Sequence, residues 1–151
     1  MSQLLMDQAL RAAREGRGIH KFINDDDTVT AGFLVSALAN IYFDIPAGKR
    51  VVVVSIMFGC ETADDKVEVY MVGCDAITGG GSPTQKMAHY DQYVGNVKDQ
   101  KAYIWEPFYV PLIFNYSDGH RSVSMAVKAT DTDAIVSYGW CGWYEDEGTL
   151  S

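Results

Sequence analysis

The chain has 151 residues, which is enough for one domain with a sizeable core. Apolar residues make up 48% of it and charged residues 21%, which excludes extensive intrinsic disorder, and no apolar run is long enough for a membrane helix. The formal net charge of −8 argues against a general nucleic-acid binder.

The charge is distributed unevenly along the chain. Residues 1–24 contain four basic and two acidic side chains, a net charge of +2, whereas the remainder holds eight bases and 18 acids, a net charge of −10. We predict a basic arm that lies on its own acidic domain, on a neighbouring copy or on another acidic partner. Residues 1–15 lack the apolar run of a signal peptide, so we expect a protein that is not secreted by the usual route.

Residues 2–14 have the pattern of a short amphipathic helix. Leu5, Ala9 and Ala12 follow helical spacing, and Gly16 ends the pattern. A helix of this length is marginal in isolation, so it must pack on its own body or on another chain. Because the sequence shows no docking site for it within the sandwich, we expect the helix to form only in the assembled state. The residues expected at this contact are Leu5, Leu10, Arg11 and Arg14.

The remaining sequence has the alternation and turn signals of an all-β domain. The predicted strands cover residues 28–38, 41–45, 50–60, 66–74, 85–94, 102–116, 122–129 and 134–144. About eight strands with no helix between them predict an antiparallel, jelly-roll-like β-sandwich. We divide the chain into an N-terminal helical arm with an acidic link, residues 1–27, and a β-sandwich domain, residues 28–151.

Two features of the strands predict how they are placed. The valine run at residues 51–54 is typical of a strand that is covered on both faces. Pro107 and Pro111 cannot donate to a sheet, so they indicate an edge, a bulge or a crossing between sheets. The predicted core residues are Val52, Val54, Ile56, Phe58, Val67, Val69, Met71, Val123, Met125 and Val127.

The last strand is unusually aromatic. Alternation places Tyr138, Trp140 and Tyr144 on one face and Cys141 and Trp143 on the other. One face packs on the core, and the other is either covered within the chain or exposed as a strip for protein contacts or sugar stacking. We expect part of the aromatic set to be buried between subunits. The aromatic interface candidates are Trp105, Tyr138, Trp140 and Tyr144.

The cysteines and histidines show no pattern of a catalytic or metal site. The three cysteines are Cys60, Cys74 and Cys141, and the three histidines are His20, His89 and His120. An odd number of widely spaced cysteines predicts buried free thiols in a reducing compartment. The histidines lack metal-ligand spacing, and we expect His120, in a turn beside Asp118, to be solvated.

Acidic groups occur at residues 25–27, 64–65, 131–133 and 145–147, and we expect them to be solvated turn residues. Hard cations prefer such oxygen clusters, but the spacing does not match an EF-hand loop. The chain also lacks the phosphate-loop, nucleophile-elbow, zinc-protease and dinucleotide motifs. We therefore predict no enzyme activity and no cofactor.

One junction resembles a known class of proteins. The turn Ile45-Pro46-Ala47-Gly48-Lys49, followed by the valine run, is similar to the β-sandwich modules of tailed-phage virion proteins. A short helical arm before such a sandwich resembles head decoration and auxiliary capsid proteins, and the resemblance covers residues 1–144. It implies a non-enzymatic homo-oligomer bound to a larger protein shell, made in a reducing host cytoplasm and located in the virion, without nucleic-acid or membrane partners.

Two other functions stay open. A carbohydrate-binding module would use Trp105, Trp140 or Trp143 to stack on sugar rings, and a glycan array tests it. A small hydrolase would use acidic residues with His89 or His120. The oligomeric state in solution separates both from a shell protein.

Overall fold

The computed structural model describes residues 3–29, 35–36, 41–60, 66–79, 83–93, 102–129 and 134–149. Helix α1 (Gln3–Arg14) precedes a series of β-strands. The strands are β1 (Gly18–Val29), β2 (Val35–Ser36), β3 (Phe43–Asp44), β4 (Lys49–Cys60), β5 (Lys66–Cys74), β6 (Pro83–Tyr93), β7 (Ala102–Asn115), β8 (Ser122–Ala129) and β9 (Ala134–Asp146). A short 3-10 turn (Tyr116–Asp118) lies between β7 and β8.

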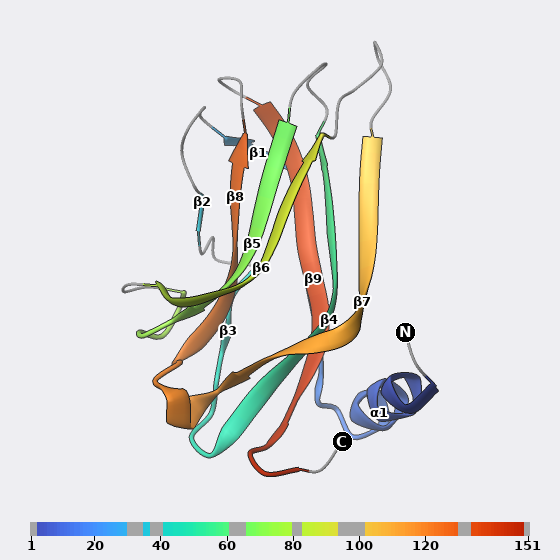
Figure 1. Cartoon of the computed structure of the whole chain (residues 1–151), viewed down its shortest axis with the longest axis vertical. Helices are drawn as coiled ribbons and strands as arrows, with labels where there is room; N and C mark the ends of the chain where they lie inside the picture. The colour runs from blue at the N-terminus through green and yellow to red at the C-terminus, as the bar shows by residue number, and fades with distance from the viewer. Residues whose placement is uncertain are drawn as a thin grey trace.

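The strands form two facing antiparallel sheets (Figure 1). Sheet A has the order β1-β9-β4-β7, and sheet B has the order β2-β8-β5-β6. The short strands β2 and β3 both pair with β8, so together they act as one interrupted edge strand of sheet B. Counted in this way, the described residues form an eight-stranded jelly roll, whose strand order combines two Greek keys. The predicted fold class is confirmed.

The main core fills the space between the sheets, because both inner faces present apolar side chains at alternate positions. Of the predicted core residues, those found there are Ile56, Phe58, Met71, Val123 and Met125. Val52 and Val54 are also buried, but on the outer face of sheet A beneath α1, so their predicted inward orientation is wrong. The side chains of Val67, Val69 and Val127 lie outside the described residues.

A bulge in β4 explains this difference. Val53 lies opposite Gly142 of β9, and the next paired position is Ser55 opposite Cys141. Strand β4 therefore has one more residue than β9 here, which is Val54. The extra residue reverses which alternate positions face inward. The valine run is covered on both sides, as predicted, but the valines predicted to face inward face outward, and the others face inward.

The two prolines of β7 lie at a sheet edge, as predicted. Strand β7 is the outermost strand of sheet A. Its register with β4 jumps from Leu112 opposite Val53 to Pro107 opposite Ser55. The segment between these two points bulges away from regular pairing and includes Pro111, which has no N–H to donate.

Strand β1 differs most from the prediction. Residues 24–27, predicted as an acidic link, lie within β1, which pairs with β9 from Gly18 onward and shifts register between Ile23 and Asp27. Charged residues are tolerated there because β1 is an edge strand of sheet A. Of the strand predicted at residues 28–38, only residues 28–29 and 35–36 are described, and they belong to β1 and β2.

Candidate assembly surface

Helix α1 packs on the outer face of sheet A, near the end of β9 (Figure 1). Leu5 and Ala12 are buried there against Val52, Val54 and Trp143, which together we call the helix-docking cluster. Burying a leucine in this way stabilises the folded chain by about 1.5–3 kcal/mol. The helix therefore has a docking site on its own chain, and the expectation that it finds one only in an assembly is wrong.

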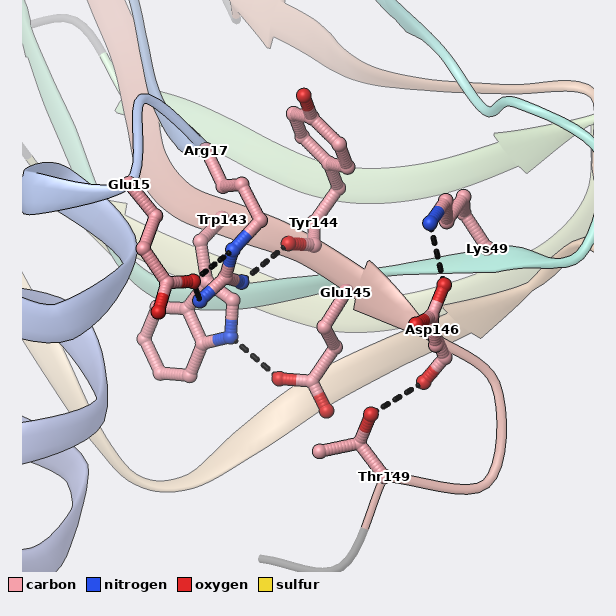
Figure 2. Close-up of polar contacts among 8 residues, drawn as sticks. All are labelled: Glu15, Arg17, Lys49, Trp143, Tyr144, Glu145, Asp146 and Thr149. Atoms are coloured by element: carbon pink, nitrogen blue, oxygen red, sulfur yellow. Dashed lines mark hydrogen bonds and ion pairs between the residues drawn. The ribbon is translucent and has the colours of Figure 1, made fainter.

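A buried ion pair fixes the tryptophan of this cluster. The Glu145 carboxylate accepts a hydrogen bond from Trp143 Nε1 at 2.5 Å, and it accepts two more from Arg50, through Nη2 at 2.6 Å and Nε at 3.0 Å. The Arg50 and Glu145 side chains are only 13% and 10% exposed. Because both oxygens of the carboxylate are occupied, the indole ring is held in one orientation beneath α1 (Figure 2).

A second set of contacts fixes the turn between α1 and β1. Arg17 donates from Nη1 to the Tyr144 carbonyl at 2.6 Å and from Nε to the Glu15 carboxylate at 2.8 Å (Figure 2). In return, the Tyr144 backbone N–H donates to the Arg17 carbonyl at 3.2 Å. These hydrogen bonds join the turn to β9 and so fix the position of α1 relative to the sheet.

The acidic tail, expected to be solvated, is instead bound to the body of the protein. Besides the Glu145 contacts, Lys49 forms an ion pair with Asp146, and Glu147 accepts a hydrogen bond from the Ser117 N–H at 2.7 Å. The hydrogen bond and charge of Lys49 lower the pKa of Asp146. These carboxylates are occupied within the chain. No group of three or more metal-ligating side chains occurs among the described residues.

Helix α1 carries apolar side chains that no described part of the chain covers. Leu4, Met6 and Leu10 are 56%, 47% and 54% exposed. Met6 and Leu10 are four residues apart, so they lie next to each other on one side of the helix, whereas Leu4 lies on a different side. Arg11 and Arg14 are exposed in the last turn. Of the residues predicted at an interface, Leu10, Arg11 and Arg14 are exposed and Leu5 is buried, and the contact itself stays a prediction.

A groove of about 210 Å³ lies between β1, β4 and β9. The side chains that alternation directs to the outer face of sheet A there are His20, Phe22, Ser55, Met57 and Cys141. Gly139 is needed at this place because an added Cβ would lie 2.3 Å from the Lys21 carbonyl oxygen and 2.8 Å from the Phe22 ring. We call this feature the outer groove.

The sequence did not predict the outer groove, because β1 was expected to begin ten residues later than Gly18. The alternation of His20 and Phe22, opposite two small residues of the last strand, is the signal that would have revealed it.

The aromatic candidates of the last strand lie mostly inside the protein. Tyr138 and Trp140 are 0% and 1% exposed in the core between the sheets, so they are not contact residues of the folded chain. Trp140 Nε1 donates to the Ile41 carbonyl at 2.6 Å. Tyr144 is half-buried and stacks on Phe43, with ring centroids 5.5 Å apart. These residues face inward because the bulge aligns their face of β9 with the inner face of β4.

The other two tryptophans are Trp143 and Trp105, and only the first has a described side chain. Trp143 is 2% exposed and belongs to the helix-docking cluster. Trp105 lies on β7 opposite Met57, with β4 between β7 and β9, and its side chain lies outside the described residues. The two tryptophan side chains that the structure describes are therefore unavailable for stacking on a sugar.

The described thiols and the turn histidine are not activated groups. Cys74 and Cys141 are free, and burial raises the pKa of each thiol, so both are protonated and poorly nucleophilic. His120 is 2% exposed, with its ring edge-on to Phe114, and burial lowers its pKa. The expectation that His120 is solvated is wrong, because its turn folds back onto the core. His89 and the thiol of Cys60 lie outside the described side chains.

Comparisons with known proteins return matches only among solved structures. No protein-family model matches the chain, and no curated protein matches it. A chain from the structure of infectious bursal disease virus Gx strain is similar, with a TM-score of 0.48 and 10% identity. The alignment covers 89% of this chain and 34% of that one, so the chain spans about a third of that protein's length.

Two further solved structures are also similar to the chain. A chain of the cowpea mosaic virus empty virus-like particle has a TM-score of 0.38 and 7% identity, covering 89% of this chain and 83% of that one. The tobacco streak virus coat protein has a TM-score of 0.28 and 6% identity, with 89% and 91% covered. Similarity at this level gives no basis for assigning a function, which has to be argued from the surface itself. None of the described helices is long and apolar enough to cross a membrane.

Proposed function

We propose that this protein is a non-enzymatic structural component of a virion, an oligomeric jelly-roll subunit of the capsid-surface decoration or auxiliary type. The observation that carries the proposal is the external face of α1, where a helix fastened to a jelly roll leaves the adjacent side chains of Met6 and Leu10 uncovered. Jelly rolls of two Greek keys occur in viral capsid and lectin domains. Uncovered apolar side chains on a fixed helix favour assembly over sugar binding.

The burial and ionisation of the candidate site residues also favour a structural role. The buried indoles of Trp140 and Trp143 disfavour the carbohydrate-binding alternative, and the protonated thiols and buried His120 disfavour a hydrolase. The net charge of −8 suits a protein on the outside of a shell, away from packaged nucleic acid.

Immunogold labelling of intact particles from the same source tests the virion role. We expect antibodies against the purified protein to label the particle surface. Particles that contain none of the protein would contradict the proposal. Sedimentation of the purified chain tests oligomer formation separately, and a glycan array with reproducible hits would revive the carbohydrate-binding alternative.

A further inference from the structure

The outer groove and the exposed side of α1 lie on the same face of the molecule. Helix α1 covers Val52, Val54 and Trp143, and the outer groove continues along the same two strands, over Ser55 and Cys141. Half of this face is therefore raised by a helix and the other half is hollowed. A face of this kind is complementary to a copy of itself turned by a two-fold axis.

We propose that the outer groove of one copy binds the Met6 and Leu10 side of α1 from a second copy, and that the contact is reciprocal. This inference rests on the proposed assembly as an oligomer and names the surface and the partner. Met6 and Leu10 supply two adjacent, half-exposed aliphatic side chains. The groove supplies an apolar lining that includes Phe22 and Met57.

The orientation of α1 on its own chain brings this side toward the groove. Gln8 and Glu15 face the acidic tail, and helical geometry places Met6 and Leu10 on the opposite side of the helix. Ala13, which shares that side, lies against Gly18 at the start of β1, two residues before His20 in the groove. The exposed apolar side chains and the groove therefore border one another, and docking would cover both.

Charge distribution favours a second copy as the occupant. Arg14 follows Leu10 by one helical turn on the exposed part of α1, while β1 continues beyond Phe22 into three consecutive aspartates at residues 25–27. Strand β1 is an edge strand of sheet A, and this acidic segment follows the groove residue Phe22 along it. A basic helix end beside an acidic strand directs the approach of the two copies and fixes their orientation.

The decisive variant is Leu10→Glu, compared with Leu4→Glu as a matched control. Both leucines are about half exposed on α1, but Leu4 lies on a different side of the helix. By sedimentation over a range of concentrations, we expect Leu10→Glu to weaken dimer formation by about tenfold or more, as for loss of one apolar anchor. We expect Leu4→Glu to leave it unchanged, and equal melting temperatures would show that both variants fold.

A cross-link identifies the groove as the binding site. In Leu10→Cys, oxidation at alkaline pH, where the Cys141 thiol with its raised pKa ionises, is expected to give a covalent dimer through the native Cys141, and the band should disappear in Leu10→Cys with Cys141→Ser. A dimer band that survives the second substitution would overturn the groove assignment. Oligomers that are indifferent to Leu10→Glu contradict this inference alone, whereas a chain that is monomeric at every concentration also contradicts the proposed oligomer. Labelling of intact particles remains an independent test of the virion role.

Discussion

Trp140→Phe tests whether the aromatic face of β9 belongs to the core of the single chain. Trp140 is 1% exposed, and its Nε1 donates to the carbonyl of Ile41, which is itself 0% exposed. The substitution removes the donor and part of the ring, and water has no access to replace either. The orphaned carbonyl costs about 1–3 kcal/mol, and the lost ring volume brings the total to about 2–4 kcal/mol.

For a chain of this size that loss corresponds to a fall in melting temperature of about 4–16 °C. Thermal unfolding followed by tryptophan fluorescence or circular dichroism measures it. The control is Leu4→Ala on the exposed side of α1, which should stay within about 0.5 kcal/mol of the original chain. If Trp140→Phe melts normally while the assembled mass falls, then Trp140 lies at a subunit contact and its assignment to the core is wrong.

Three further predictions concern β9 and the helix that packs on it. Gly142→Ala should destabilise the chain by about 1–3 kcal/mol in chemical unfolding, because a Cβ there would lie 2.0 Å from the Val52 carbonyl oxygen; an unchanged midpoint would contradict the close approach of β4 and β9. Leu5→Ala should cost about 2–5 kcal/mol and shift the emission of the tryptophan beneath α1 to longer wavelength, and a loss of stability without that shift would contradict helix docking. The lowered pKa of Asp146 means that its ion pair stabilises the fold above pH 3.8 and that this contribution is lost as the pH falls through the lowered value. Lys49→Gln should therefore lower the melting temperature more at neutral pH than at about pH 2, and an equal difference at both would refute the linkage.

The positions of most strands could be predicted because their signals are local. Alternation placed Val123 and Met125 on the inner face, and the prolines of β7 marked an edge. The bulge at Val54 could not be predicted, because a run of four valines reads the same in either register. Only the partner strands, which supply Gly142 and Cys141 on either side of the bulge, determine which valines face inward.

The candidate surface was harder to predict, because it depends on contacts between distant segments. Leu10, Arg11 and Arg14, predicted as interface residues, are exposed on the helix, and their contacts stay a prediction. Leu5 was misassigned because the outer face of sheet A that receives it is built from residues far along the chain, including Trp143. His20 and Phe22 were missed because the acidic run that follows them concealed the beginning of an edge strand.

The strand order of sheet A also constrains when this surface can exist. Strand β9 lies between β1 and β4, although it follows both of them in the sequence by many residues. During synthesis, β1 and β4 therefore lack the strand that lies between them until β9, the last of the described strands, has been made. Pairing between such distant segments is slow, because a long loop must close before any contact is gained. Trp143 and Glu145 belong to that same strand, so the docking site of α1 forms only when β9 has paired. A partially synthesised chain thus lacks a positioned helix, and this ordering would delay the proposed contacts between copies until each copy has folded.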